Sequence, residues 1–300
     1  VVGGMIVDYI ELARRSTQRW MSILTGIASQ AAIAVENSRL LQEAEEQTRM
    51  KQELDVARRI QTGFLPERCP TIRGWDLAAI WRSAREVGGD FYDFVPLPPG
   101  VGQGGMEELR NGVIIADVAD KGVPAALFMA LCRTLVRTVS IDGRPPGVAI
   151  GRANNLILAD ARSGLFVTLF YAILHSDSAE ISFVNAGHMP PVVMRAADGA
   201  VEELRTGGLA LGVLPNVEFE QRTTRLGPGD VLVLYTDGVT DAMDSSEQMF
   251  GRERLIEMIK THRDRSAGEL AQVISDTVAD FAGGTPQFDD FTLVVARRTA

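Results

Sequence analysis

Apolar residues recur with a helical period over the first quarter of the chain. No Gly or Pro interrupts residues 27–61. A roughly heptad rhythm runs through Ile27, Ala31, Ala34, Ser38 and Leu41, and after the charged stretch EAEEQTRMKQE the stripe resumes at Leu54, Ala57, Ile60 and Phe64. This pattern predicts one long helix that begins near Ser16 and ends before Pro66 and Pro70.

Such a helix could pack on its own domain or serve as a dimerising coiled coil. The charged middle section favours an exposed coiled-coil connector. Residues 1–10 are predicted to form a strand with an internal Gly-Gly. The chain starts on VVGGMIVDYI without an initiator Met, which suggests that a further segment precedes it.

From Trp75 onward, β-like runs are interspersed with amphipathic helices. We expect strands near 76–82, 90–96, 112–117, 166–175, 180–186, 190–195, 231–236 and 291–298, and helices near 123–140, 147–162, 251–262 and 266–282. The segment 99–112 is typical of a glycine-rich hairpin or loop. Because the strands come in groups, the order favours an α+β fold of antiparallel sheets with helices outside, not a doubly wound parallel sheet.

Composition and charge narrow the class of protein. The hydrophobic content of 46% is typical of a well-cored globular chain, and a net charge of −9 without a basic cluster argues against nucleic acid as a partner. Cys69 and Cys132 are far apart in sequence, so neither a disulfide framework nor a zinc site is expected. With no signal sequence and no apolar run of roughly 18 residues, we expect a cytoplasmic protein without a membrane span.

Four aspartates lie where an apolar strand meets a turn or a glycine. They are Asp90 in VGGDFYDF, Asp117 in VIIADVADKG, Asp237 in VLVLYTDGVTDA and Asp289 in FDDFTLVVAR. Taken singly, each could be a turn-capping or solvated acid. Taken together they suggest one pocket, in which clustered carboxylates would repel each other unless cations neutralised them. The pattern predicts a metal-dependent hydrolase with hard divalent ions.

Two neighbouring acids extend this set. Asp93 could join the pocket from the turn after Asp90, or lie on a surface loop. In FDDFT, adjacent side chains of an extended chain point in opposite directions, so only one of Asp289 and Asp290 should face the pocket. The pattern leaves open which of the two it is.

The motifs VGGDFYDF, ADVADKGVPAALFMA, NAGHMPP, LYTDGVTDA and FDDFTLVV, in this order, resemble the SpoIIE/RsbU-like serine phosphatases of the PPM (PP2C-like) superfamily. The likeness covers about residues 50–298. It implies an α/β/β/α sandwich with two Mn²⁺ or Mg²⁺ ions at one edge. Residues 1–42 resemble the end of a GAF-like sensor domain, residues 43–70 a helical coiled-coil linker and residues 71–300 the phosphatase domain.

The resemblance also implies roles for individual residues. Asp117 would bridge both metals and Val118 would lend its carbonyl, with the remaining ligands from Asp90, Asp237 and Asp289. The preference for Asp289 over Asp290 follows the family's Asp-Asp/Asn pair. Arg85 matches a position that holds the substrate phosphate in some PP2C-like enzymes, a task that suits a guanidinium, although it could be an ordinary surface arginine.

Two departures from the family pattern affect the chemistry. Asp120 stands where glycine or serine is usual, and could be an outer-shell acid or a turn residue. Ala119 stands where eukaryotic-type PP2C enzymes have a general-acid histidine, so leaving-group protonation must come from elsewhere. His188 in NAGHMPP is a candidate donor, but it would also suit a hairpin tip.

By resemblance the chain is a protein serine/threonine phosphatase in which a two-metal-activated water attacks phosphorus. Its substrate would be a phosphorylated anti-anti-sigma (STAS-like) protein in stress-response sigma factor regulation, and the long helix would form a homodimer and transmit a signal from an upstream sensor. The switch would include Leu54, Ala57, Ile60, Phe64 and Leu65. Alternatives are a catalytically silent signalling module of the same fold and a two-metal phosphodiesterase, which the absence of His-rich motifs and basic patches disfavours.

Overall fold

The computed structural model describes residues 17–101, 107–160 and 164–299. The chain divides into two compact units, Val1–Ala57 and Arg58–Ala300. In the first unit the described part is helix α1 (Thr17–Thr62), whose last turn belongs to the second unit. The long helix expected from the uninterrupted periodicity is therefore present. The strand expected at residues 1–10 lies outside the described residues.

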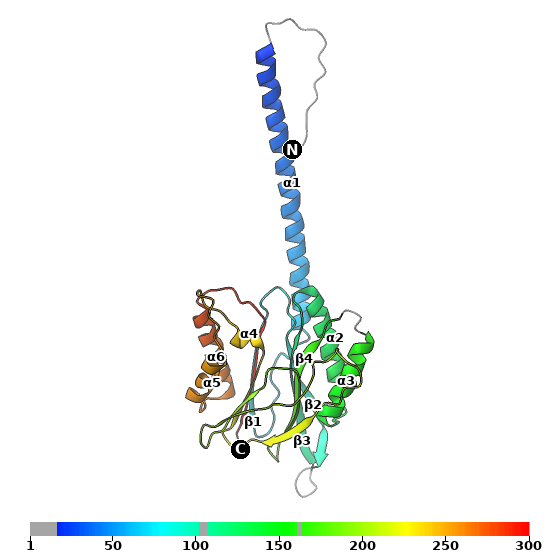
Figure 1. The fold of residues 1–300 in the computed structure, drawn as a ribbon, viewed down its shortest axis with the longest axis vertical. Helices are drawn as coiled ribbons and strands as arrows, with labels where there is room; N and C mark the ends of the chain where they lie inside the picture. Colours follow the sequence, from blue (N-terminus) through cyan, green and yellow to red (C-terminus); the bar gives the residue numbers. More distant parts are fainter. Residues whose placement is uncertain (1–16, 102–106, 161–163, 300) are drawn as a thin grey trace. The chain divides into compact units, whose positions relative to one another are not determined.

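The second unit contains two five-stranded antiparallel sheets (Figure 1). One sheet has the order β1-β10-β9-β6-β7, formed by Trp75–Arg82, Phe291–Arg298, Val231–Tyr235, Val192–Met194 and Val201–Glu203. The other has the order β2-β3-β4-β5-β8, formed by Phe91–Val101, Glu107–Val118, Val167–His175, Glu180–Ala186 and Gln221–Arg225. The predicted fold of two antiparallel sheets flanked by helices is confirmed.

Strands β9 and β10 show why the sheets stack. Their side chains alternate in direction, and both faces are apolar. On β9, Val231, Val233 and Tyr235 belong to the core under one helical layer, whereas Leu232 and Leu234 belong to the core that includes the second sheet. A strand buried on both faces requires a covering layer on each, which produces the four-layer sandwich.

Helices supply the outer layers (Figure 1). On one side lie α2 (Val123–Ser140) and α3 (Pro146–Asp160), and on the other lie α5 (Arg252–Thr261) and α6 (Ala267–Ala282). Helix α6 begins with a capping box between Ser266 and Glu269 and ends at Gly283 with φ 58°. In the described part of the chain, α2 alone has the length and mean hydropathy of a membrane span, but it packs as a core helix with Phe128, Met129, Cys132 and Val136 buried.

The sequence missed three short elements. Strand β7 has three residues, β8 reads QRTTR with no apolar alternation, and α4 (Asp237–Thr240) is a single turn after β9. The two strands take their hydrogen bonds from neighbouring strands, and α4 is held by bonds within its own turn, such as that from the Asp241 N–H to the Asp237 carbonyl. The segment 99–112, expected as a glycine-rich hairpin or loop, belongs to a hairpin: it contributes to β2 up to Val101 and to β3 from Glu107, and these strands pair antiparallel.

Candidate metal centre

Strand register brings the acidic strand ends together. In the β2–β3 pair Phe91 lies opposite Ala116, so Asp90 and Asp117 follow at the same end of the ladder. In the β9–β10 pair Tyr235 lies opposite Leu293, so the Thr236-Asp237 and Asp289-Asp290 segments share one end. Asp90 and Asp117 lie at the end of one sheet, and the segments Thr236-Asp237 and Asp289-Asp290 lie at the end of the other. Hydrogen bonds from Thr236 and Thr292 to Asp90 join these two sheet ends.

Those hydrogen bonds hold Asp90 at the centre of the cluster. Its carboxylate is 1% exposed, and Oδ2 accepts from the hydroxyls of Thr236 and Thr292, both at 2.6 Å. Thr236 follows β9 and Thr292 lies on β10, so two threonines of one sheet fix an aspartate of the other. Sequence reasoning missed both threonines; a polar residue inside an otherwise apolar strand was the available signal.

The acids strongly affect one another. Burial, together with the charges of Asp117 and Asp290, raises the pKa of Asp90 well above its ordinary value. Burial and the charges of Asp237 and Asp289 raise the pKa of Asp117 to about 7. Burial and Asp289 also raise the pKa of Asp237. The cluster therefore carries more negative charge than its surroundings neutralise.

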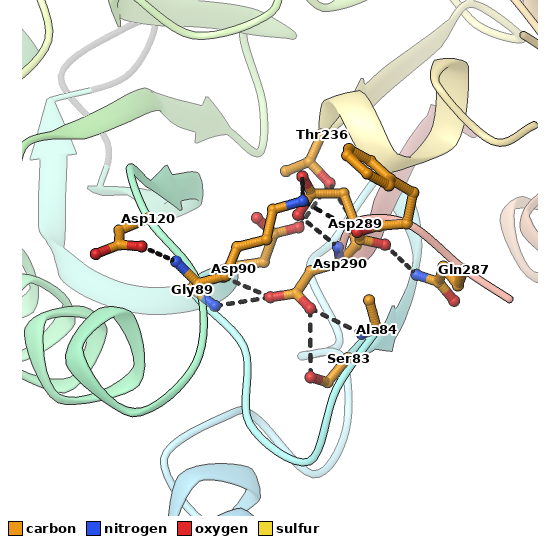
Figure 2. Close-up of polar contacts among 11 residues, drawn as sticks. Ser83, Ala84, Gly89, Asp90, Asp120, Thr236, Gln287, Asp289 and Asp290 are labelled. Carbon is orange, nitrogen blue, oxygen red and sulfur yellow. Dashed lines mark hydrogen bonds and ion pairs between the residues drawn. The ribbon is translucent and has the colours of Figure 1, made fainter.

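Asp290 has both carboxylate oxygens committed to the loop that precedes β2 (Figure 2). Oδ1 accepts from the backbone N–H of Ala84 at 2.8 Å and from the Ser83 hydroxyl at 3.3 Å. Oδ2 accepts from the N–H of Gly89 at 2.7 Å and of Asp90 at 3.3 Å. Asp290 thus acts as an anchor for the loop 83–90, which carries Arg85 and Asp90.

Asp289 lies in a different environment from its neighbour. Its Oδ2 forms an ion pair with Lys121 Nζ at 2.8 Å, and its side chain is 27% exposed. It lines a small pocket together with other acids, two basic residues and glycines: Arg85, Gly88, Gly89, Asp117, Asp120, Lys121, Gly122 and Asp290. Of the two adjacent aspartates, Asp289 is the one whose side chain can turn toward an ion in this pocket.

Two glycines allow the segments to approach closely. A Cβ on Gly89 would lie 3.0 Å from the Val118 carbonyl oxygen, the backbone atom expected to bind metal. A Cβ on Gly238 would collide with the carbonyl oxygen of Asp290. Glycine at both positions therefore keeps the Val118 carbonyl accessible and lets the turn after Asp237 pack against the start of β10.

Asp93 does not join the cluster. It is 1% exposed, and its carboxylate forms ion pairs with Arg137 at 2.7 Å and Arg133 at 3.0 Å, both on α2. Arg137 also donates to the Phe94 carbonyl. The side chain therefore fastens β2 to α2 instead of serving as an additional ligand or lying on a surface loop.

Asp120 and His188 have structural contacts. Asp120 has φ 88° and its Oδ1 accepts from the N–H of Lys121 at 2.8 Å, as in a turn residue. His188 is buried, and burial lowers its pKa to about 4. Its Nδ1 lies 2.9 Å from the hydroxyl of Thr168, which donates to the Asp117 carbonyl at 3.4 Å. A neutral, buried histidine is a poor source of a proton, so His188 is better suited to orienting the backbone near Asp117.

The chemical type of the available donor atoms suits a divalent cation. Within the described ranges, no three acidic, histidine or cysteine side chains are already placed to hold one ion. The available groups are hard oxygens, and their mutual repulsion is the condition that Mg²⁺ or Mn²⁺ relieves. The aspartates fit these ions and would have to shift their side chains to bind one.

Comparison with known proteins decides the family. The profile of the Stage II sporulation protein E (SpoIIE) family matches residues 108–299. The chain belongs to the SpoIIE/RsbU family of PP2C-type serine phosphatases. It is 32% identical to Protein IcfG of Synechocystis sp. over 82% of this chain and 41% of that protein. It is 29% identical to Phosphoserine phosphatase RsbU of Bacillus subtilis over 84% of this chain and 72% of that protein.

Solved structures of PP2C-type and serine threonine phosphatase domains share the fold. The SiaA-PP2C domain of Pseudomonas aeruginosa has a TM-score of 0.71 and 23% identity, covering 84% of this chain and 98% of that one. The catalytic domain of serine threonine protein phosphatase PstP, in complex with two manganese ions, has a TM-score of 0.54 and 18% identity, covering 75% of this chain and 99% of that one. The chain spans less than half the length of IcfG.

Loss of the Asp93 charge should destabilise the fold without affecting the acidic cluster. In Asp93→Asn, two arginines lose their buried anion, and we expect unfolding to require about 3 kcal/mol less free energy. Urea denaturation of the variant and of Asp55→Asn, an exposed control on α1, measures this difference. An Asp93→Asn midpoint equal to that of the control would contradict the structural role.

The raised pKa of Asp117 should appear as a pH-dependent stability difference. Protonation of Asp117 favours the folded state, a contribution that is full below the unfolded value near 3.8 and is lost as pH rises through about 7. Without metal, Asp117→Asn should therefore melt above the parent protein at pH 8, by roughly 2–4 °C for each kcal/mol of relieved repulsion. The difference should shrink at pH 5.5. Melting curves in EDTA at both pH values test this, and a gap independent of pH would show that Asp117 is not the responsible group.

Proposed function

We propose that this chain is a metal-dependent protein serine/threonine phosphatase. The observation that supports this most is the set of aspartates at the joined sheet ends, where burial and neighbouring carboxylates raise the pKa of Asp90, Asp117 and Asp237. The relative RsbU is a phosphoserine phosphatase, and PstP binds two manganese ions in the same fold. The proposed reaction is hydrolysis of a phosphoric monoester on a protein side chain.

In this proposal Asp90, Asp117, Asp237 and Asp289 hold two Mn²⁺ or Mg²⁺ ions with the Val118 carbonyl. Bound ions would supply an activated water and stabilise negative charge on the transferring phosphoryl group. Asp289 is preferred to Asp290 because both oxygens of Asp290 already accept from the loop 83–90.

Arg85 and the threonine pair complete the proposed site. Arg85 is exposed at the pocket and has no hydrogen-bond or ion-pair partner among the described residues, so its guanidinium is free to bind the substrate phosphate. Thr236 and Thr292 orient the Asp90 carboxylate by donating to Oδ2. Neither role requires a phosphorylated enzyme intermediate.

The proposed substrate is a phosphorylated regulatory protein of the anti-anti-sigma (STAS-like) class, and the proposed location is the cytoplasm. The likeness to RsbU supports the substrate class. Both cysteines are free, as in a reducing compartment. A silent signalling module is a weaker candidate because the acidic set is complete. A phosphodiesterase is weaker because the proposed donors are four carboxylates and one backbone carbonyl, with no histidine among them.

A phosphate-release assay tests the activity. With Mn²⁺, the chain should release phosphate from a phosphoserine peptide, and Asp117→Ala should reduce kcat by at least about 100-fold because the central carboxylate is lost. EDTA should abolish release from the parent protein. A cyclic dinucleotide serves as the competing substrate class. Equal, metal-independent rates for the two proteins would refute the phosphatase, and cleavage of the dinucleotide alone would favour the phosphodiesterase.

We further propose that the end of α1 regulates the site. Gln61, in the last turn of α1, forms two hydrogen bonds with one backbone unit: its Nε2 donates to the Gly88 carbonyl at 2.5 Å, and its Oε1 accepts from the Gly88 N–H at 3.1 Å. Among the proposed switch residues, Leu65 is in the core and Ile60 is 59% exposed. Because Gln61 binds Gly88, rotation of the last turn of α1 would act first on Gly88, two residues before Asp90.

The exposed apolar residues of α1 suit a second copy of the chain. Within the first unit, large apolar side chains are exposed at Trp20, Met21, Ile23, Ile27, Ile33, Val35, Leu40, Leu41, Met50 and Val56. A single helix cannot bury these residues on itself, and a parallel partner helix would cover those that lie on the heptad stripe, such as Ile27 and Leu41. A homodimer through α1, with Leu54 and Ala57 at its end and a GAF-like sensor upstream, is therefore proposed.

Gln61→Ala should uncouple the helix from the site. Loss of both hydrogen bonds loosens the loop that carries Asp90, so we expect the Mn²⁺ concentration for half-maximal activity to rise by about three- to tenfold. Thr62→Ala is a matched control, because the Thr62 hydroxyl bonds only within the helix, to the Arg58 carbonyl. Identical Mn²⁺ dependence in all three proteins would argue against regulation through Gln61.

A further inference from the structure

Lys121 is a cation placed inside the acidic pocket. Its Nζ lies 2.8 Å from Asp289 Oδ2, donates to the Phe288 carbonyl at 3.0 Å and sits 3.9 Å from the centre of the Phe288 ring. The lysine follows β3 and the aspartate precedes β10, so the contact joins segments of the two sheets across the pocket. Three different interactions thus hold one ammonium beside one carboxylate.

The ammonium also acts beyond its direct partner. Its charge lowers the pKa of Asp237 and opposes the effects of burial and of Asp289. Lys121 and Arg85 are the basic residues that line the pocket, and Lys121 is the one paired with an acid there. At one edge of the cluster, Asp237 and Asp289 have the positive charge of Lys121 beside them. At the buried edge, the negative charge of Asp90 and Asp117 is offset by threonine hydroxyls on Asp90 and by protonation.

We propose that Lys121 is a resident counter-ion that competes with a divalent metal ion for Asp289 and so sets the metal affinity of this edge of the site. The inference rests on the metal-binding part of the proposed function. Oδ1 of Asp289 accepts from the backbone N–H of Asp290 at 2.9 Å, and Oδ2 faces the Lys121 ammonium at 2.8 Å. A cation that approaches Oδ2 therefore meets the positive charge of Lys121 at close range. Metal binding at Oδ2 is opposed by this charge until the lysine side chain turns away.

The geometry makes this exchange feasible. The side chains of Lys121 and Asp289 are 32% and 27% exposed, so the pair is screened by water and is of moderate strength. After release, the Phe288 carbonyl and ring can retain the ammonium at the pocket mouth. A flexible four-carbon side chain suits this movement, and the freed charge then stands where a phosphate group would arrive.

Titration of the full chain with Mn²⁺ by calorimetry, without substrate, tests the proposal. Lys121→Met removes the competing charge and keeps an apolar stem for the Phe288 ring, and it should bind Mn²⁺ about three- to tenfold more tightly than the parent. Lys260→Met, an exposed change of the same residue type and charge on α5, should leave the affinity unchanged. A general effect of net charge would shift both variants alike and would overturn the proposal.

Two further proteins establish the partner and guard against misfolding. In an Asp289→Asn background, Lys121→Met should no longer tighten binding, because the contested carboxylate is absent. Lys121→Gln provides a polar alternative in case the methionine variant does not fold, and melting in EDTA confirms folding of each protein. Unchanged or weaker Mn²⁺ binding by folded Lys121 variants refutes the competition, as does an absence of Mn²⁺ binding in every protein.

The readout separates this inference from the phosphatase activity. Affinity is measured without turnover, so a chain that binds Mn²⁺ more tightly as Lys121→Met but releases no phosphate upholds the counter-ion and refutes the enzyme. If the parent chain releases phosphate but Lys121→Met leaves the Mn²⁺ affinity unaltered, the enzyme is upheld and the counter-ion is refuted.

Discussion

Repulsion among aspartates is the constraint around which this fold is organised. Asp90, Asp117 and Asp237 each have a raised pKa because burial removes water from the carboxylate and because other acids lie nearby. Folding into two stacked sheets does not by itself require this crowding. The apolar layers instead provide the free energy that makes it tolerable, since β9 and β10 are buried on both faces. An enzyme of the proposed kind needs such a concentration of charge, because a neutral site would not attract divalent ions.

Different devices stabilise the individual acids. Asp90 receives two threonine hydroxyls, Asp290 receives backbone N–H groups, Asp93 has two arginines and Asp289 has a lysine. Acids bound by backbone N–H groups or arginines have a fixed structural task. The acid bound by an exposed lysine keeps a partner that can be exchanged. The type of partner therefore separates structural carboxylates from those available for chemistry better than burial does.

The sequence allowed most of the sandwich and the location of its acidic edge to be predicted. Asp117 and Asp237 stand out because an apolar strand runs directly into each, and this local pattern reflects the strand itself. Thr236, Thr292, Lys121 and Gln61 could not be assigned in the same way, since each acts on a residue that is distant in sequence. Asp93 had the local pattern of a pocket residue, yet its partners on α2 decide its role. Local patterns identify strand ends, whereas strand register and helix packing determine which side chains meet.

Gly88 and Gly89 lie between two anchors, the Gln61 amide on one side and the Asp290 carboxylate on the other. Both anchors bind the backbone of these two glycines, where there is no room for a side chain, so the connection does not depend on side chains at exposed loop positions such as Glu86. An exposed position such as Glu86 is therefore free to differ among related proteins, to suit different phosphoproteins, while the mechanical link stays intact. Substrate choice and signal input can in this way evolve separately within one eight-residue loop, residues 83–90.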